Sequence, residues 1–379
     1  MEVNRTVFRE DHEMLRDTAR RFFVRECVPR QEAWNQAGRV DRESWLKAGR
    51  EGLLCVTIPT EYGGGGGDFG HAAVICEEMH GAGLSGVGFG LHSDIVAPYV
   101  VRLGTEEQKR KWLPGICAGE TILAVAITEP GGGSDVKACR TTAVRDGDEW
   151  VINGSKTFIS NGMSADMVMV VCKTDPAAGA RGVSLIMVET SREGFRRGRK
   201  LEKVGQPAAD TAELFFDNVR VPATNLLGEE NKGFGYLMEE LAQERLLIAV
   251  YAATALERLL GITVEYVKER KAFGGTVWDF QNSKFKLADI KAQSVALRTL
   301  VDYYIGENMR RRLTVQEAAI AKLHASETLW KAIDDMVQLH GGYGYMLEYP
   351  IARAFTDYRV SRIAGGTNEV QRELIARQL

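Results

Sequence analysis

The sequence predicts an α+β protein of several domains, with helices at both ends and strands in the middle. At 379 residues the chain is too long for one ordinary hydrophobic core, so two or three domains are expected. Apolar residues recur at helical spacing up to about residue 120, and short β-branched segments replace them from residue 121. Helical spacing returns at residue 229. We therefore predict a helical domain over 1–120, a β domain over 121–228 and a helical bundle over 229–379.

The first domain contains clear helix start signals and one long glycine run. Asp11 is expected to cap a helix that runs through Trp34, and Asp41 is expected to cap the next helix. Five consecutive glycines at 63–67 have too much backbone entropy to lose in a helix or strand. No Lys-Ser/Thr pair follows them, as it would in a phosphate-binding loop. This run is predicted to be a surface turn.

The middle domain consists of short apolar segments separated by turn signals. Asn153-Gly154 and Asp146-Gly147 are two-residue turn signals of β-hairpins. No helix of any length fits between the predicted strands, so we expect a largely antiparallel sheet. About a hundred residues of such strands are expected to close into a barrel or a sandwich.

The last domain is predicted to hold four amphipathic helices with short connections, which is typical of a bundle. They are expected at 231–271, 279–310 and 315–340, with a short terminal helix from Thr367. The predicted fold is therefore an N-terminal helical domain, a central antiparallel β-barrel or sandwich and a C-terminal four-helix bundle.

Composition and charge exclude several classes of protein. The formal net charge of −3 gives no basis for binding nucleic acid or an anionic membrane. No run of about eighteen apolar residues is present, so no transmembrane segment is expected. The six cysteines form no CxxC pair, and His324 and His340 have no second ligand at metal-binding spacing, so we expect neither a metal nor disulfides. The N-terminus lacks the apolar segment of a secretory signal, and we expect a cytoplasmic protein.

A carboxylate lies within the apolar stripe of the helix predicted at 231–271. Glu244 falls three residues after Leu241 and four before Ile248, on the side that should face the core. Burying a carboxylate is costly unless it is paired, hydrogen-bonded or protonated. Spacing alone leaves two interpretations open: a structural pair with Arg245 at the edge of a core, or a base made stronger by its apolar surroundings.

Four further stretches are suited to holding a polar or flat ligand. Residues 128–135 (TEPGGGSD) end a strand with glycines, which let backbone N–H groups approach a ligand closely. Residues 156–162 (KTFISNG) form a strand whose Phe158 either stacks on a flat ring or belongs to the core. Residues 270–274 (RKAFG) and 338–344 (QLHGGYG) place a cation, an amide or bare backbone near helix ends, where phosphates bind.

These stretches occur in the same order in acyl-CoA dehydrogenases, and the chain resembles that family over its full length. The resemblance rests on ITEPGGGSD, KTFISNG, DTAELFFDNVRVP, ERKAFG, QLHGGYGY and GGTNEVQRELIAR. No single stretch is decisive, but six in register leave little room for chance. The helix sequence LAQERLLIA and the GGTNE terminus are most similar to the long-chain branch of the family.

The resemblance implies that FAD binds between the β domain and the helical bundle, with a neighbouring subunit completing the site. The family's flavin-contacting turn and the strand against its flavin ring match Val125, Ile127, Thr128, Gly133, Ser134, Phe158, Ile159 and Ser160. The pyrophosphate and adenosine contacts made across the family's dimer match Arg270, Phe273, Gln281, Gln338, Gly341 and Gly342, and the last contacts match Thr367 and Glu369. Phe158 stands where many members have Trp. A homotetramer built as a pair of dimers is implied.

One departure from the family pattern bears on catalysis. Most members carry the catalytic base near the C-terminus, where this chain has Gly365. A minority branch, which includes the long-chain and isovaleryl enzymes, places its Glu on the helix that here carries Glu244. The resemblance therefore implies that Glu244 is the general base. The implied substrate contacts are Ser134, Ala242, Arg245, Gly365 and Gly366.

The reaction implied by the resemblance is α,β-dehydrogenation of a medium- to long-chain acyl-CoA to the trans-2-enoyl-CoA, as in fatty acid β-oxidation. Glu244 would take the α-proton while a hydride passes to FAD, and the backbone N–H of Gly365 with a flavin ribityl hydroxyl would stabilise the enolate. Electrons would then pass to an electron-transfer flavoprotein. Branched, short-chain and carrier-protein thioesters stay open as substrates. A retained Glu244 argues against a flavin oxidase or monooxygenase on the same fold, and against an inactive scaffold.

Overall fold

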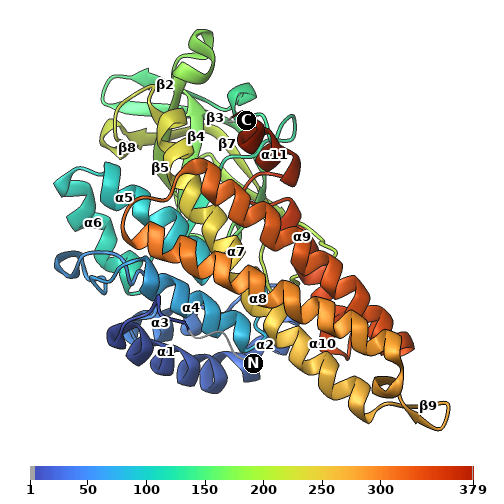
Figure 1. Ribbon diagram of the computed structural model, residues 1–379. Helices are drawn as coiled ribbons and strands as arrows, with labels where there is room; N and C mark the ends of the chain where they lie inside the picture. The colour runs from blue at the N-terminus through green and yellow to red at the C-terminus, as the bar shows by residue number, and fades with distance from the viewer. Residues whose placement is uncertain (1–4, 378) are drawn as a thin grey trace.

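The computed structural model describes residues 5–377 and 379, and it confirms the predicted succession of helices, sheet and helices (Figure 1). The N-terminal helices are α1 (Glu10–Phe22), α2 (Gln31–Ala37), α3 (Arg42–Arg50), α4 (Phe69–Gly81), α5 (Ala97–Leu103) and α6 (Glu106–Cys117). The strands of the middle domain are β1 (Leu123–Ala126), β2 (Thr142–Asp146), β3 (Glu149–Ile159), β4 (Met167–Lys173), β5 (Val183–Glu189), β6 (Phe195–Lys200), β7 (Ala212–Pro222) and β8 (Leu226–Leu227). The C-terminal elements are α7 (Gly233–Glu269), β9 (Lys271–Ala272), β10 (Gly275–Thr276), α8 (Gln281–Met309), α9 (Val315–His340), α10 (Pro350–Asp357) and α11 (Asn368–Ala376).

The start of the chain differs from the prediction in two details. Arg9, not Asp11, occupies the N-cap position of α1, and Asp11 lies in the first turn, where its charge favours the helix dipole. The helix expected to run through Trp34 is interrupted at 23–30 by a π turn and a 3-10 turn that contains a proline, which has no backbone N–H to donate. Asp41 caps α3 as predicted, by accepting the backbone N–H of Ser44 at 2.9 Å.

The eight strands form one sheet, in the order β6-β7-β3-β2-β4-β5-β8, with β1 beside β4. Most neighbours are antiparallel, as predicted, but β1 runs parallel to β4 with Leu123 opposite Met167. Parallel pairing requires a long connection, and the β2–β3 hairpin lies within it. Alternate residues of β4 face opposite sides: Val168 and Val170 belong to the core of the sheet itself, whereas Met169 packs against the helices. The sheet path is an open one, because its end strands β6 and β8 pair with other strands and not with each other.

Three long helices, α7, α8 and α9, pack on one another in the C-terminal domain, and the short α11 packs on α9 (Figure 1). The sequence analysis missed α10, which also lies against α9. This helix has only eight residues, and Pro350 at its start provides the fixed φ that suits a first turn. Its apolar buried residues are Ile351, Ala352 and Ala354, but eight residues make only about two turns, too short a stretch for a helical period to be recognised along the sequence.

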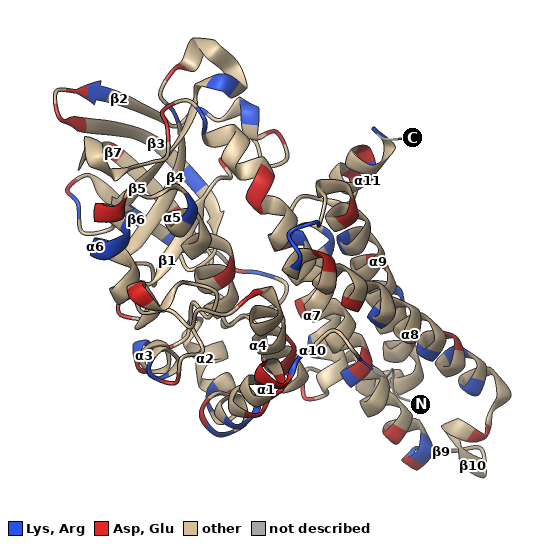
Figure 2. Cartoon of the chain, turned by 60° about the vertical axis from the view of Figure 1, so that its left-hand side comes forward, with Lys and Arg blue, Asp and Glu red and all other residues tan. Residues whose placement is uncertain are grey.

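The long helix α7 forms the centre of the molecule. By length and composition it could cross a membrane, but 61% of its most apolar window is buried inside the protein, as in the core helix of a folded domain. It contacts α4 from the N-terminal domain as well as α8 and α9. In the view of Figure 2, Lys and Arg are interspersed with Asp and Glu over the molecule, in keeping with the small net charge.

Candidate active site

The middle of α7 brings Glu244 next to the segment that precedes α11. A Cβ atom built on Gly365 would lie 3.8 Å from Oε1 of Glu244 and 2.6 Å from Cδ1 of Ile248. Gly365 has φ +65°, a left-handed conformation that favours glycine over residues with a Cβ. The predicted base and the glycine at the more common base position therefore meet at one point.

Glu244 has no ion-pair partner among the described residues, although Arg245 is its neighbour in the sequence. Burial raises the pKa of Glu244, and the positive charges of Arg245 and Lys322 offset only part of that rise. In the described part of the chain, no ion pair joins Glu244 to Arg245; instead Nε of Arg245 donates to the carbonyl oxygen of Gly365 at 3.3 Å. The interpretation of a structural Glu–Arg pair is therefore wrong. A carboxylate in apolar surroundings is a stronger base than one in water.

Two side chains that the sequence analysis missed hold the Gly365 segment. The buried Lys322 on α9 donates to the carbonyl oxygen of Gly366 at 2.9 Å and to Oδ1 of Asn368 at 2.7 Å. Nε2 of Gln371 donates to the carbonyl oxygens of Gly366 at 2.8 Å and Gly365 at 3.2 Å. Burial lowers the pKa of Lys322 to about 8. Lys322 lies among buried alanines on α9. A charged residue within an apolar helical stripe, the pattern that indicated Glu244, is therefore present here as well.

The backbone N–H groups of this segment are available to a ligand. Among the residues that the structure describes, neither the N–H of Gly365 nor that of Gly366 has a hydrogen-bond acceptor. Their carbonyl groups are engaged by Arg245, Lys322 and Gln371, which fixes the peptide planes. Free N–H groups fixed by their surroundings are suited to stabilising negative charge on a carbonyl oxygen.

The glycine-rich turn after β1 lies beside the end of β3, as the predicted flavin contacts require. The N–H of Thr157 donates to the carbonyl oxygen of Thr128 at 2.9 Å, which brings the two stretches together. Phe158 is 67% exposed and has φ +59°, so its alternative assignment to the core is wrong. The N–H groups of Gly133 and Ser134 also have no acceptor within the described ranges. An exposed aromatic ring beside free N–H groups fits a flat, polar ring system such as a flavin.

A buried ion pair between Lys156 and Glu129 stabilises the glycine-rich turn after β1. Nζ of Lys156 lies 2.8 Å from Oε1 of Glu129 and donates to the carbonyl oxygen of Ile127 at 3.0 Å. The same Glu129 oxygen accepts the hydroxyl of Thr141 at 2.6 Å. Burial by itself would raise the pKa of Glu129, but the hydrogen bonds from Lys156 and Thr141 outweigh it and lower the pKa to about 2. Glu129 belongs to the stretch 128–135 and Lys156 to the stretch 156–162, but no sequence pattern predicts that the two side chains form an ion pair.

The predicted phosphate and adenosine contacts gather at the opposite end of the molecule. A cavity of about 670 Å³ at the ends of α7 and α9 is lined by Arg270, Phe273, Gln338, Gly341 and Gly342, and the exposed Gln281 begins α8 nearby. Phe273 is 97% exposed. The 37 residues of α7 span about 55 Å, and Figure 1 shows this end, marked by β9, far from the sheet. One chain does not bring both groups of predicted FAD contacts together.

The remaining predicted residues lie on α7, at the start of α11 and on or next to the strands β1 and β3. Thr367 caps α11 by accepting the N–H of Val370 at 3.4 Å, and Glu369 lies exposed in the first turn. Ala242 is buried on α7, two residues before Glu244. Val125 is half-buried in β1, whereas Ile159 is buried at the end of β3. Ser160 follows it and is half-buried.

The histidines take part in structural contacts. His340 stacks on Tyr266 with ring centroids 4.1 Å apart, and its Nδ1 contacts the carbonyl oxygen of Met336 at 2.8 Å. One group not foreseen from the sequence, Asp11, His12 and His71, places possible metal-ligand atoms within 4.8 Å of one another. These histidines also contact Asp68, and this links the starts of α1 and α4.

Comparison with known proteins agrees with this arrangement over the whole chain. Family models described as the N-terminal, middle and C-terminal domains of acyl-CoA dehydrogenase match residues 9–120, 124–219 and 231–379. A long-chain specific acyl-CoA dehydrogenase, mitochondrial, from Sus scrofa is 50% identical over 377 residues, which cover 99% of this chain and 88% of that protein.

Solved structures give the same result. The crystal structure of an acyl-CoA dehydrogenase from Geobacillus kaustophilus has a TM-score of 0.97 and 50% identity, and 99% of each chain is covered. A glutaryl-CoA dehydrogenase from Mycobacterium smegmatis, described in complex with FADH2, has a TM-score of 0.91 and 27% identity, with 98% of this chain and 95% of that chain covered. Matched in order from its first helix to its last, the chain belongs to the acyl-CoA dehydrogenase family.

Proposed function

We propose that this protein uses FAD to convert a medium- to long-chain acyl-CoA into the trans-2-enoyl-CoA, with Glu244 as the general base. The observation that carries the proposal is the meeting of Glu244 with Gly365, whose neighbouring N–H groups are free. Base and oxyanion donors thus lie on the two sides of one small space. The long-chain relative that is 50% identical supports the choice of substrate class.

The residues beside β1 and β3 fit a flavin. Thr128, Gly133 and Ser134 offer hydroxyl and backbone groups, and the exposed Phe158 offers an aromatic face. The related glutaryl-CoA dehydrogenase, described in complex with FADH2, supports a flavin cofactor. When bound, FAD supplies the acceptor for the hydride that leaves the β-carbon of the acyl chain.

Glu244 removes the α-proton of the thioester. This proton is too weakly acidic for a carboxylate unless the developing enolate is stabilised, and the free N–H groups of Gly365 and Gly366 are placed to donate to the thioester oxygen. Arg245, Lys322 and Gln371 keep these donors in position through the carbonyl groups of the same segment. Burial makes Glu244 more basic, and an apolar acyl chain that excludes water would strengthen this effect.

The position of the second group of FAD contacts supports a shared site between subunits. Arg270, Phe273 and Gln338 line a cavity together with exposed apolar side chains, among them Tyr343 and Met346. Such a patch is expected to be covered in solution. A neighbouring subunit placed there would bring these residues to the other chain's flavin, in a homotetramer built from two dimers. An electron-transfer flavoprotein is the proposed acceptor of the electrons.

One experiment tests the proposal. Anaerobic reduction of the bound flavin is followed with straight-chain acyl-CoAs of 4 to about 18 carbons, and oxygen or an electron-transfer flavoprotein is then added. We expect reduction by the medium and long chains, and reoxidation by the flavoprotein much faster than by oxygen. Reduction by isovaleryl-CoA or four-carbon chains alone would contradict the substrate class. Rapid reoxidation by oxygen would identify an oxidase instead.

A further inference from the structure

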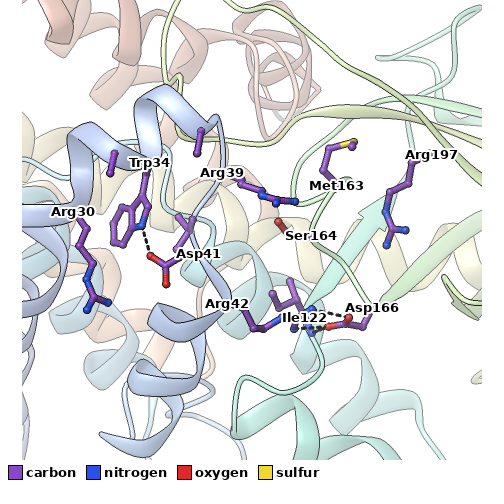
Figure 3. Close-up of a pocket in the computed structure, with 13 residues that line it drawn as sticks. Arg30, Trp34, Arg39, Asp41, Arg42, Ile122, Met163, Ser164, Asp166 and Arg197 are labelled. Carbon is purple, nitrogen blue, oxygen red and sulfur yellow. Dashed lines mark hydrogen bonds and ion pairs between the residues drawn. The ribbon is translucent and has the colours of Figure 1, made fainter.

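A second cavity, of about 700 Å³, lies between the N-terminal helices and the β domain (Figure 3). One wall comes from α2, the α2–α3 connection and the start of α3, including Arg30, Arg39 and Arg42. The opposite wall comes from residues 163–166 and from Arg197 on β6. We call this cavity the interdomain pocket.

The interdomain pocket is separate from the candidate active site. Ile122 and Asp166, which line it, immediately precede the paired strands β1 and β4. The predicted flavin contacts Ile127 and Thr128 follow the other end of β1, and the four residues of this strand span about 13 Å. The cavity at Arg270 is farther away still, at the ends of α7 and α9.

The charge of the pocket is positive. Four arginines and two aspartates line it, a surplus of two positive charges. Arg42 makes a two-pronged ion pair with Asp166, with both N–O distances 2.7 Å. The other carboxylate, Asp41, accepts the indole N–H of Trp34 at 2.6 Å and caps α3. Arg30 lies 3.9 Å from both Glu26 and Glu43, which are outside the pocket lining. Two of the four arginines, Arg39 and Arg197, remain on the open side.

Arg39 and Arg197 have no carboxylate within 4.0 Å among residues 5–377. Arg39 is exposed, and Figure 3 shows it reaching from the α2–α3 connection toward Ser164. The guanidinium group of Arg197 is oriented by two hydrogen bonds, which it donates to the carbonyl oxygens of Gly162 at 3.2 Å and Ala165 at 2.6 Å. Its Nη1 has no acceptor in the same described range, so two N–H donors of a fixed guanidinium stay free.

A third cation lies at the rim. A Cβ atom built on Gly38, which ends α2 with φ +67°, would overlap the ammonium group of Lys200. Lys200 also has no carboxylate partner in the described part of the chain. It ends β6, the strand that carries Arg197, so the two domains place Arg39, Arg197 and Lys200 around one space.

We propose that the interdomain pocket binds a phosphate-bearing small molecule of nucleotide size. A phosphate monoester carries about two negative charges near pH 7, which matches the two arginines, Arg39 and Arg197, that have no carboxylate partner in the described residues. The planar guanidinium groups of arginine suit phosphate oxygens, and Arg39 and Arg197 offer them from opposite walls. The volume falls in the range of about 300–1,000 Å³ that is usual for small-molecule sites. Ile122, Met163 and Val40 supply apolar surface for the rest of the ligand.

Titration calorimetry with pyrophosphate and with ADP tests the proposal on the flavin-loaded protein. We expect both to bind, and Arg39→Ala to weaken binding about tenfold, since a charge-assisted hydrogen bond is lost. Arg39 is exposed and makes no described contact that folding requires. Arg50→Ala is the control, because Arg50 is exposed on α3 outside the pocket. Equal affinity in wild type and Arg39→Ala would overturn the proposal, and so would the absence of binding.

A second readout separates this pocket from the phosphate sites of FAD and acyl-CoA. Phenylglyoxal modifies accessible arginines, and mass spectrometry locates the modified residues. Pyrophosphate is expected to protect Arg39 at least tenfold and to leave Arg50 unprotected. Equal protection of both, or of neither, would contradict the site. Malonate, a dicarboxylate, serves as the third probe: weaker binding than pyrophosphate supports a phosphate ligand, and equal or tighter binding refutes that class.

Discussion

Glu244 and Gly365 face each other across the candidate active site, with Oε1 of Glu244 only 3.8 Å from the place where a Cβ of residue 365 would lie. A carboxylate from α7 thus occupies the space that a side chain in the segment before α11 would otherwise enter. Either element could deliver a base to the same proton. This relationship supports the proposal that Glu244 is the base in a chain that has glycine at position 365.

Glu244→Gln should slow flavin reduction by acyl-CoA by roughly 10²–10⁴-fold, because the shape is kept and the base is removed. Stopped-flow absorbance under anaerobic conditions measures this rate, and equilibrium titration should show that FAD and acyl-CoA still bind. Glu240→Gln is the matched control, one turn earlier on α7, where Glu240 pairs with Arg102 at 2.7 Å. An undiminished rate in Glu244→Gln would refute its role as base.

Adding Gly365→Glu to Glu244→Gln should restore part of the activity, because a carboxylate returns to the same proton from the other side. Recovery should be incomplete, since φ +65° strains any residue with a Cβ and that Cβ would press on Cδ1 of Ile248 at 2.6 Å. Shortening that neighbour with Ile248→Val should improve the rescue. The rate of flavin reduction is the measurement, with Gly365→Gln as control. Equal rates for the Glu and Gln variants would contradict the shared position.

Lys322→Met should slow flavin reduction about tenfold while leaving FAD bound, because the carbonyl of Gly366 loses a donor worth on the order of 1–2 kcal/mol. The segment that carries the two free N–H groups would then be less well positioned. Single-turnover kinetics measures the effect, and Lys331→Met, on an exposed position of the same helix, is the control. Unchanged kinetics would show that Lys322 does not position this segment.

Glu129 should make the stability of the protein depend on pH in the acid range. Its pKa is about 2 in the folded protein, against an ordinary value of 4.5, so its contribution is fully present above pH 4.5 and is lost as the pH falls toward 2. Urea unfolding at pH 7, 4 and 3 should show Glu129→Gln to be less stable at pH 7 by on the order of 3 kcal/mol. This deficit should shrink as the pH falls. Glu149→Gln, at a more exposed ion pair with Arg220, is the control. A deficit that is the same at all three pH values would contradict the linkage.

Phe273→Asp should weaken both subunit association and FAD retention, because the exposed ring lies among the contacts assigned to the neighbouring chain's cofactor. Analytical ultracentrifugation reports the assembly, and the ratio of flavin to protein absorbance after gel filtration reports the cofactor. Val144→Asp changes an exposed apolar residue on β2 instead and should leave both unchanged. A wild-type monomer that retains FAD would contradict the shared site.

Elements with a local sequence signal have the structure that was predicted for them. Asp41 caps α3, and the bounds of α9 agree with the prediction at both ends, because capping and apolar spacing act within a few residues. Short elements whose conformation depends on packing against the rest of the protein were not predicted. The interruption after Phe22, the short α10 and the exposed, left-handed Phe158 have no pattern that distinguishes them from their neighbours.

The chain alone determined the succession of helical, β and helical domains, the motifs of the site and the presence of a carboxylate in an apolar stripe. These follow from periodicity and from residue types, which are readable along the chain. Only the tertiary structure decided that Arg245 bonds to Gly365 and not to Glu244, and that Lys156 meets Glu129. It also decided that the two groups of predicted FAD contacts lie far apart in one chain. The physical reason is that such contacts depend on how whole helices and strands dock. Docking depends on the burial of many side chains together. The positions of two residues in the sequence therefore do not reveal whether they will be in contact.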